Sequence, residues 1–346
     1  MEAYEMKGII GKDNTISEIS RRLRDSPIFV LLAGCTDVSK VPGITGAGAT
    51  PDLTFLTPTL DSEIIGDGKS ISSEIPPITP DGIPTPAIPS RAMLNLSSAE
   101  SFVVDAGFSI YPKTSYYHTG LGPARNPEVG RALIEAEKAF GIGQKIGKLL
   151  SKGSMVIIAE TIPGGTTTAQ VVMSTYGGFR SSSSLPDDPT DVKNQIVRRS
   201  FARKKLSSKE PLELVAEYGD YTMAISLGIC ASAETDVLLS GGTQMANIFH
   251  LVSLSSAEKL PYLITNRWLM QHRHDTMESL VPPGRLLVSD LNFSNSRHLG
   301  LRAYERGIVR EGVGISAAFF SALANGSSEE MVYSEIDRFY ETFRDL

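Results

Sequence analysis

Short and almost uninterrupted runs of apolar residues recur along the chain, and they constrain its fold more than any other feature. Such runs are typical of strands that are covered on both faces, as in parallel sheets. Helical stretches separate the runs, so the sequence predicts an α/β fold with a doubly wound, mostly parallel sheet. The predicted strands are residues 28–32, 53–56, 102–105, 155–159, 236–239, 262–265 and 286–289.

The predicted helices fall into two groups. Those between strands cover residues 127–150, 211–229 and 243–254. Three more follow the last strand, at residues 296–306, 314–324 and 327–343, and the amphipathic stretch 17–24 is suited to pack with them. We therefore expect an α/β nucleotide-binding core of residues 25–295 and a small helical subdomain built from residues 1–24 and 296–346.

Two segments interrupt the alternation of strands and helices. Residues 75–89 are too rich in proline for a helix or a central strand. They fit an ordered extended segment that crosses the surface or lines a site, although composition alone slightly favours a linker. Residues 180–209 contain four consecutive serines and a basic run, and they predict a mobile excursion whose charges form a solvated face.

Composition excludes several classes of function. The chain has 346 residues, 41% of them hydrophobic and 21% charged, which suits a globular protein with a sizeable core. Its net charge of −6 argues against binding to nucleic acid or to an anionic membrane. No apolar run approaches the roughly 20 residues that span a bilayer, and residues 28–34 are too few for a signal peptide. We expect a cytoplasmic protein.

The sequence offers little for a metal or a redox centre. Cys35 and Cys230 lie far apart and match no metal or redox spacing, so two buried free thiols are expected. His272 and His274 are spaced to share one face of a strand, but no third ligand has a recognisable spacing, and surface histidines are the commoner case. We therefore expect no metal and no cofactor.

Ligands of open parallel sheets bind beyond the carboxyl ends of the strands, so the loops there are the places to search. The glycine- or hydroxyl-rich loops are residues 33–37, 105–109, 160–169, 240–245 and 289–296. In the third of these, Gly164 and Gly165 let the backbone approach an anion closely, and Thr166 and Thr167 supply hydroxyls at a helix start. The combination predicts a phosphate cradle.

The loop at residues 240–245 repeats this arrangement, with Gly241 and Gly242 before a helix that starts near Thr243. One such loop is weak evidence, because tight strand–helix turns use Gly-Gly for steric reasons alone. Two loops of this kind on one side of a sheet favour phosphate binding over bare turn geometry.

Two glutamates are candidates for acid–base chemistry. Glu160 lies at a strand end, where capping of neighbouring N–H groups is the simpler role. Glu311 precedes Gly312 and Gly314, a spacing that lets backbone approach a flat ligand. A carboxylate in partly apolar surroundings has a raised pKa and can act as a base near neutrality. On these grounds alone an ordinary solvated glutamate at a helix junction is equally compatible.

Other catalytic motifs lose support. Residues 141–150, GIGQKIGKLL, resemble a phosphate loop only superficially, because their spacing is wrong and they lie inside a helical pattern. The sequence has no G-x-S-x-G motif and no dinucleotide fingerprint with its acidic partner. P-loop hydrolysis, hydride transfer and serine-esterase chemistry are therefore disfavoured.

Three short patterns at these loops occur together in one known family. The first, approximately Glu-x-Gly-Ile-Gly-Asn-Thr-Thr, is matched at Glu160, Gly164, Thr166 and Thr167 and departs at Ile162, Pro163 and Gly165. The second, Gly-Gly-x-Glu-Ile, is matched at Gly241 and Gly242, with Gln244 in place of the carboxylate. The third, Gly-Glu-Gly-Thr-Gly-Ala, is matched at Glu311, Gly312 and Gly314, with Arg310 and Val313 as substitutions.

In these positions the chain resembles the nicotinate-nucleotide:dimethylbenzimidazole phosphoribosyltransferase family of cobamide biosynthesis, in a divergent archaeal-type branch. Residues 103–112 are also similar to a family segment, and the matches keep their order over residues 103–314. The resemblance implies an enzyme that moves ribose 5-phosphate from nicotinate mononucleotide to a benzimidazole-type or purine base, giving an α-ribotide. It also implies a homodimer whose partners are these small molecules.

The resemblance implies a role for each matched residue. Glu311 would be the general base, and Glu160 would stabilise the oxocarbenium charge or hold the ribose. The two Gly-Gly loops, with Gly164, Gly165, Thr166, Thr167, Gly241, Gly242 and Thr243, would hold the 5′-phosphate, and the backbone of Gly312 and Gly314 would border the base. The departures at Gln244 and around Gly164 bear on the substrate, and the Pro-rich segment near Arg91 is a candidate for base contacts.

Three alternatives stay open. The same site could hydrolyse the nucleotide with water as the acceptor, or bind it without catalysis. The glycines could also be plain turns of a structural α/β protein.

Overall fold

The parallel sheet predicted from the apolar runs is present. In a computed structural model, which describes residues 6–48, 51–255, 259–309 and 311–344, seven strands lie in the order β1-β7-β6-β5-β4-β2-β3. Only β1 is antiparallel to its neighbour. The strands are β1 Ile9–Ile10, β2 Ile28–Ala33, β3 Glu100–Asp105, β4 Met155–Thr161, β5 Asp236–Ser240, β6 Tyr262–Asn266 and β7 Leu286–Ser289.

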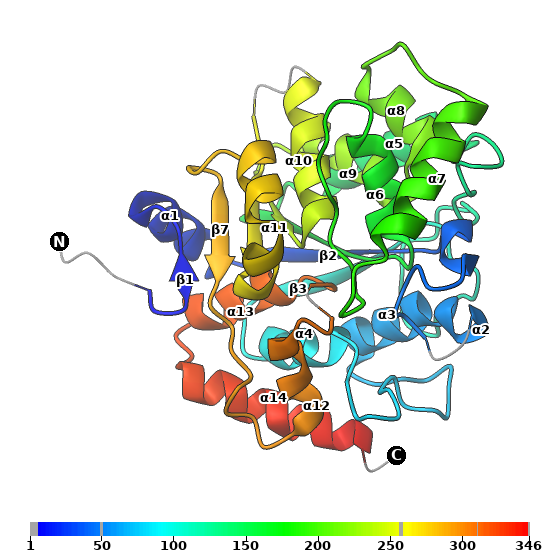
Figure 1. The fold of residues 1–346 in the computed structure, drawn as a ribbon. Coiled ribbons are helices and arrows are strands. Elements are labelled where there is room, and N and C mark those ends of the chain that lie inside the picture. The colour runs from blue at the N-terminus through cyan, green and yellow to red at the C-terminus, as the bar shows by residue number, and fades with distance from the viewer. Residues whose placement is uncertain (1–5, 49–50, 256–258, 310, 345–346) are drawn as a thin grey trace.

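Helices cover both faces of the sheet (Figure 1). Alternate residues of each strand feed two separate cores: Leu32 and Ile158 point into one, and Leu31 and Ile157 into the other. The first core is covered by α5 Ala136–Leu150, α6 Gly165–Met173, α7 Thr190–Arg203, α8 Pro211–Tyr218, α9 Tyr221–Ser232 and α10 Thr243–Leu254. This double coverage is why the strands read as continuous apolar runs.

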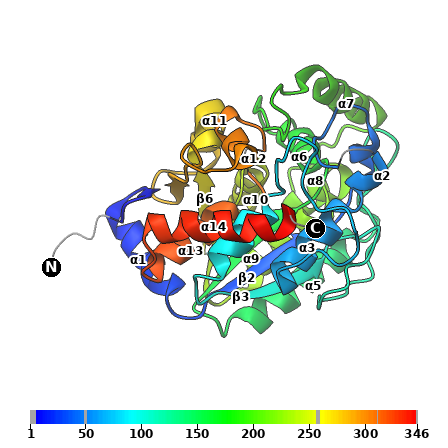
Figure 2. The ribbon, with the colours of Figure 1, turned by 90° about the horizontal axis from the view of Figure 1, so that it is seen from below.

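The second core lies under helices from both ends of the chain. It is covered by α1 Asp13–Leu23, α3 Thr57–Asp67, α4 Ala87–Leu94, α12 Leu299–Arg302, α13 Ile315–Ala324 and α14 Glu329–Arg344. Figure 2 shows α13 and α14 running side by side across this face, with α1 near the end of α13, where the Asn325 side chain donates to the Leu23 carbonyl at 3.1 Å. Helix α11 Arg267–Leu280 contributes to both cores. The division into a core and an end-derived subdomain stays a prediction.

Six of the seven predicted strands are confirmed, and the strand at residues 53–56 is wrong. Its residues belong to the short helix α2 Pro51–Thr54 and to the turn that leads into α3. Pro58 lies in the first turn of α3, a position that proline favours. The short edge strand β1 was not predicted, because two residues give no periodic signal.

Several helix boundaries also differ from prediction. The helix expected from residue 127 begins at Ala136, because Asn126 forms a turn in which its side chain accepts from the Glu128 amide at 2.9 Å. The helix expected over 211–229 is two helices, since Asp220 caps a new one through the Met223 amide. Residues 296–306 form α12 and a 3₁₀ helix, Ala303–Arg306, rather than one continuous helix.

The remaining predicted helices are confirmed as α1, α10, α13 and α14. Residues 180–209 do not form a plain excursion, because they contain α7, whose Ile196 is buried in the first core. His272 and His274 lie exposed on helix α11 and not on a strand. Within the described residues, no helix has the length and apolarity needed to cross a membrane.

Cys35 is buried and Cys230 is partly buried, and both thiols are free. Burial raises the pKa of each thiol to about 12, with a nearby Asp105 adding to the effect at Cys35. Neither is therefore a reactive thiolate at neutral pH.

The glycines of residues 141–150 serve helix packing. A Cβ on Gly143 of α5 would lie 2.1 Å from the Ile225 carbonyl oxygen of α9, and one on Gly228 would lie 2.1 Å from the Phe140 oxygen. The two helix backbones touch at these points. The resemblance to a phosphate loop therefore has a purely steric origin.

This contact predicts opposite effects for two substitutions in one helix. Gly143→Ala should lower the free energy of unfolding by about 1–3 kcal/mol, because α5 and α9 must separate to admit the methyl group. Gly141→Ala, where a Cβ meets nothing within 4 Å, should raise it by up to about 1 kcal/mol through helix propensity. Urea unfolding of both variants tests this. Equal effects would show that the helices are not in backbone contact at Gly143.

Candidate functional site

The strand order changes direction between β2 and β4. From β2 the chain moves outward to β3, and then returns to the other side of β2 with β4. In open α/β sheets such a switch point forms a crevice at the carboxyl ends of the strands, where ligands bind. Glu160 and the loop after β4 lie at this point.

The loop after β4 is shaped by Gly164. This residue has a φ of 83°, and a Cβ on it would lie 2.5 Å from the Thr36 hydroxyl, which donates to the Pro163 carbonyl at 2.7 Å. The amides of Thr167 and Thr168 bond back to the Gly164 carbonyl at 2.9 and 3.2 Å. Thr167 is fully buried, and its hydroxyl has no partner among the described residues.

The second Gly-Gly loop, after β5, lies against the first. A Cβ on Gly165 would come within 2.4 Å of the Gln244 side-chain oxygen. The helix α10 has no side-chain cap. Within the described residues, no acceptor faces the backbone N–H groups of Gly242, Thr243 and Gln244. The structure thus brings the two predicted loops together and leaves one helix N-terminus with unpaired donors.

Gln244 is tied to a buried carboxylate. Its amide donates to the Thr222 hydroxyl at 3.1 Å and faces Asp220 at 3.5 Å. Asp220 also accepts from the Thr168 hydroxyl at 2.6 Å, and burial raises its pKa. A carboxylate in place of Gln244 would face Asp220 directly, and the two negative charges would repel each other. The neutral amide of Gln244 avoids this repulsion.

The loop before α13 brings Glu311 beside Glu160. The Val313 amide donates to the Glu160 carbonyl at 3.0 Å. Val313 has a φ of 49°, a left-handed conformation that costs a β-branched residue about 1–3 kcal/mol. Such strain is typical of functional sites, where the surrounding structure holds a backbone in place. A Cβ on Gly314 would lie 2.7 Å from Ala159, so this glycine is required for the loop to reach β4.

Glu311 is half-buried and is held by neutral donors. Its Oε2 accepts from the Asn266 side-chain amide and from the Ser316 hydroxyl, the latter at 3.1 Å. Burial raises the pKa of Glu311 to about 8, opposed by the Ser316 hydroxyl and strengthened by the charge of Glu160. A carboxylate with this pKa is a general base suited to neutral pH.

Glu160 is also half-buried, and it shares this environment. Burial raises its pKa to about 8, and the charges of Asp220 and Asp61 add to the shift. Asp61, on α3, is fully buried between the Thr161 and Thr85 hydroxyls, each at 2.6 Å, and burial raises its pKa to about 6. The carboxylates therefore form a cluster in which full ionisation is disfavoured.

The Pro-rich segment is ordered and borders this cluster. Besides the bond from Thr85 to Asp61, a Cβ on Gly312 would lie 3.3 Å from the Pro86 ring. Of the two interpretations of residues 75–89, the ordered segment therefore fits residues 75–86, which border the candidate site. For residues 87–89 the prediction of a non-helical segment is wrong, because they form the first turn of α4. Arg91 does not point to the cluster, since it donates to the Ile65 carbonyl at 2.5 Å.

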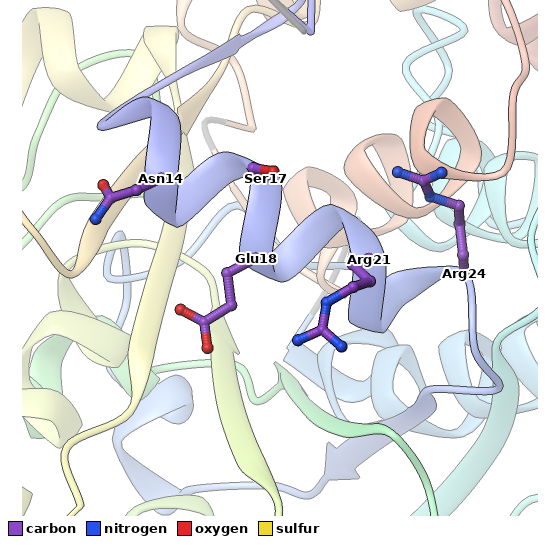
Figure 3. Close-up of a pocket in the computed structure, with 5 residues that line it drawn as sticks. All are labelled: Asn14, Ser17, Glu18, Arg21 and Arg24. Carbon is purple, nitrogen blue, oxygen red and sulfur yellow. The ribbon is translucent and has the colours of Figure 1, made fainter. Parts of the chain in front are cut away.

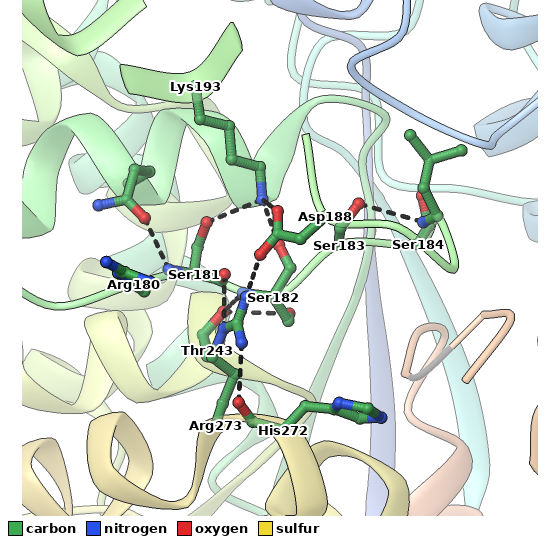
Figure 4. Close-up of polar contacts among 12 residues, drawn as sticks. Arg180, Ser181, Ser182, Ser183, Ser184, Asp188, Lys193, Thr243, His272 and Arg273 are labelled. Carbon is green, nitrogen blue, oxygen red and sulfur yellow. Dashed lines mark hydrogen bonds and ion pairs between the residues drawn. The ribbon is translucent and has the colours of Figure 1, made fainter. Parts of the chain in front are cut away.

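A serine strap, defined as residues 181–184, crosses between the site loops (Figure 4). The Ser182 amide donates to the Thr243 hydroxyl at 2.8 Å. Ser184 accepts from the Gly46 amide at its hydroxyl, 3.0 Å, and from the Val309 amide at its carbonyl, 3.3 Å. The strap thus connects the start of α10 with the loop that carries Glu311.

The strap is anchored by a partly buried charge cluster. Lys193, whose side chain is 3% exposed, donates to the Ser181 hydroxyl at 3.1 Å and pairs with Asp188 at 3.3 Å. Arg273 pairs with the same carboxylate and donates to the Ser181 carbonyl at 2.9 Å. These two basic residues hold the strap in place. The predicted basic run is a separate set, Arg198, Arg199, Arg203, Lys204 and Lys205, and all of it but the half-buried Arg203 is exposed, as expected of a solvated face.

A surface hollow lies along α1, lined by Asn14, Ser17, Glu18, Arg21 and Arg24 (Figure 3). Four of these side chains come from α1 and the fifth, Arg24, is its C-cap residue; Glu18 pairs with Arg22 at 3.4 Å. The hollow is away from the carboxyl ends of the strands and gathers no groups from other elements. It is a poor candidate for a substrate site.

Sequence reasoning missed three residues of the site: Asp61, Asp220 and Asn266. Asp61 lies just after a segment where we expected a strand, and nothing in its neighbours marks it. Asp220 lay inside an expected continuous helix, although an aspartate followed by Tyr-Thr-Met is a recognisable N-cap. Asn266 directly follows the predicted strand 262–265; it is the last residue of β6 and caps α11 by accepting from the Leu269 amide at 2.9 Å.

Comparison with known proteins places the chain in a family. No protein-family model matches it. A UPF0284 protein of Thermoplasma volcanium is 44% identical over 338 residues, which is 97% of this chain and 98% of the relative. A UPF0284 protein of Pyrococcus abyssi is 35% identical and covers 91% of this chain and 96% of its own length. The chain belongs to the UPF0284 family.

Two solved structures share the overall fold of this UPF0284 protein. The crystal structure of CobT from Thermus thermophilus superposes with a TM-score of 0.58 over 97% of this chain and 93% of that one, at 16% identity. A nicotinate-nucleotide-dimethylbenzimidazole phosphoribosyltransferase structure from the same organism gives 0.56, with 90% and 89% covered, also at 16% identity. The predicted resemblance is confirmed for the fold.

The raised carboxylate pKa values predict how stability depends on pH. An unfolded glutamate has a pKa of about 4.5, whereas folded Glu311 has about 8, so the folded state holds a proton that the unfolded state has lost between these values. The contribution of Glu311 to the free energy of unfolding is therefore complete below pH 4.5. It is lost as the pH rises to 8, by at most about 1.4 kcal/mol per pH unit.

Urea unfolding at pH 5 and pH 8 measures this effect. The wild type should lose more stability over this range than Glu311→Gln, which cannot titrate. Parallel losses in the two proteins would mean that Glu311 has an ordinary pKa.

Proposed function

We propose that this protein is a phosphoribosyltransferase that moves ribose 5-phosphate from nicotinate mononucleotide to a benzimidazole-type or purine base. The product would be an α-ribotide for assembly of the cobamide nucleotide loop. The observation that carries the proposal is the pair Glu160 and Glu311, whose pKa values are raised to about 8 at the switch point of the sheet. The CobT-like fold supports the same reaction.

The chemistry requires one base and no acid. Glu311 takes the proton from one ring nitrogen of the incoming azole, whose second nitrogen then attacks C1′ of the ribose. The C1′–N bond to the pyridinium ring of the donor breaks, and the ring keeps the electron pair as neutral pyridine nitrogen. The leaving group therefore needs no proton, and a single carboxylate with a pKa near neutrality suffices.

The second carboxylate has a complementary role in this proposal. Charge develops on the ribose as the pyridinium bond breaks, and an anion nearby stabilises it. Glu160, adjacent to Glu311 through the Val313 backbone bond, is positioned for this or for holding the ribose hydroxyls. A pair of carboxylates that resists double ionisation keeps one base available near pH 7.

The donor phosphate is assigned to the two Gly-Gly loops. The unpaired amides at Gly242, Thr243 and Gln244 offer donors and the positive end of the α10 dipole. Gly241 and the loop residues Gly164, Gly165, Thr166 and Thr167 would complete the nucleotide contacts, with the unpartnered Thr167 hydroxyl as a donor. The backbone of Gly312 and Gly314, beside Pro86, would border the incoming base.

The rest of the assignment follows from the resemblance. We propose nicotinate mononucleotide and a lower-ligand base as the only substrates, a homodimer as the assembly, and activity in the cytoplasm without a metal or cofactor. We further propose that residues 25–295 form the nucleotide-binding core, with residues 1–24 and 296–346 as the helical subdomain.

A direct assay tests the reaction. Purified protein is incubated with nicotinate mononucleotide, with and without dimethylbenzimidazole or adenine, and the products are separated by chromatography with mass detection. We expect nicotinate release that depends on the base, with an α-ribotide product. Glu311→Gln should lose at least about 100-fold in rate, since general-base catalysis contributes this much or more.

The matched control is Glu137→Gln on α5, where the side chain is 71% exposed and pairs with Arg131 at the surface. It should keep the wild-type rate. Nicotinate release without any base would identify a hydrolase. Binding of the nucleotide without release would identify a non-catalytic relative, and either result would overturn the proposal.

A further inference from the structure

We propose that Asn266 is a positioning residue that holds Glu311 as an oriented, ionised base, and this inference rests on the proposed function. Asn266 is the last residue of β6 and is fully buried. Its side chain contacts two other segments of the chain at once: the first turn of α11 and the carboxylate of Glu311. Nothing in its immediate sequence context indicates this second contact.

The capping bond fixes which way the amide faces. The Leu269 backbone amide donates to Asn266 at 2.9 Å, and a backbone N–H can only donate, so the atom that faces it is the side-chain oxygen. The NH₂ group is therefore the part that reaches Glu311 Oε2. Because the cap assigns the oxygen and nitrogen of this side chain, the Asn266 NH₂ group must be the donor to the Glu311 carboxylate.

A second donor supports the same oxygen. The Ser316 hydroxyl lies 3.1 Å from Oε2 and 3.4 Å from Oε1, and it accepts from the Ser289 hydroxyl at 3.2 Å. Oε2 thus receives the Asn266 amide and the closer contact from Ser316. Oε1 carries the weaker side-chain contact, and the backbone amides of Gly312 and Ser316 also donate to this carboxylate.

The charged surroundings make this donor important. Glu160 from β4 and Tyr304 from the 3₁₀ helix interact electrostatically with Glu311, and Asp61 from α3 interacts in the same way with both Glu160 and Tyr304. Among the described residues, no lysine or arginine forms an ion pair with Glu311. The neighbouring Arg267 is turned instead to Asp290 and Glu305. Hydrogen bonds from neutral donors therefore stabilise the ionised form of Glu311. They oppose its burial and the nearby negative charges, both of which favour the protonated form.

Replacing the NH₂ group of Asn266 by oxygen tests its contact with Glu311 separately from its role as a helix cap. Asn266→Asp keeps the helix cap, because aspartate caps as well as asparagine, but it places a carboxylate against Glu311. The midpoint at which Glu311 ionises should rise, and the acid limb of the kcat/KM profile should move to higher pH with it. At pH 7 the variant should be at least about tenfold slower than the wild type, and most of the loss should recover by about pH 9.

Asn266→Ser gives a graded second variant that adds no charge. Serine caps helices well, but its hydroxyl is too short to reach Glu311 while it caps α11. The Glu311 midpoint should rise by less than in Asn266→Asp. Asn14→Asp, at an exposed position on α1, adds the same charge away from the site and should change nothing.

Two readouts separate this inference from the proposed function. One is the pH profile of kcat/KM. The other is the ¹³C shift of glutamate carboxyls in labelled protein titrated with pH, with Glu311→Gln used to assign the signal. Wild-type activity with unchanged midpoints in both Asn266 variants would overturn the positioning role and leave the function standing. If the wild type has no transferase activity, the proposed function fails, and raised midpoints would still establish the contact between Asn266 and Glu311.

Discussion

Six parallel strands place their carboxyl ends at one edge of the sheet, and the candidate site depends on this alignment. Between β2 and β4 the connections leave in opposite directions, so a crevice opens there without any specialised loop. Residues as distant in sequence as Asp61, Glu160 and Glu311 meet at this point. The left-handed backbone at Val313 keeps the last loop in place through its bond to Glu160.

The electrostatics of the cluster follow from what surrounds each carboxylate. Hydroxyls and amides contact Asp61, Asp220 and Glu311, and the ion pairs of the described residues lie elsewhere, as at Asp188 and Glu305. Hydrogen bonds from neutral groups only partly offset the cost of burying charge. The pKa values of Glu160 and Glu311 therefore lie near neutral pH, where the ionised carboxylate is basic enough to accept a proton and is still appreciably populated. Gln244 fits this pattern, because a carboxylate at this position would add a second acidic neighbour, besides Glu160, to Asp220.

Glycines in this chain serve two separate purposes, and the sequence does not distinguish them. Gly143 and Gly228 let two helix backbones touch on the outer layer, far from any ligand. Gly165 and Gly312 have close neighbours too, but these neighbours are Gln244 and Pro86, which belong to the site. The same residue type at similar spacing thus marks packing in one place and the proposed binding surface in another. Only the identity of the opposing group separates the two cases.

The sequence by itself determined the sheet, most of its strands and the loops where chemistry was to be sought. Continuous apolar runs suffice for this, because a strand covered on both faces has no other pattern available. It also singled out Glu160, Glu311 and both Gly-Gly loops. Tertiary structure alone decided that the loops touch and that Asp61 and Asn266 join the site. The bonds from Thr161 to Asp61 and from Asn266 to Glu311 join residues that are 100 and 45 positions apart in the sequence. Their strength depends on burial, which local sequence does not encode.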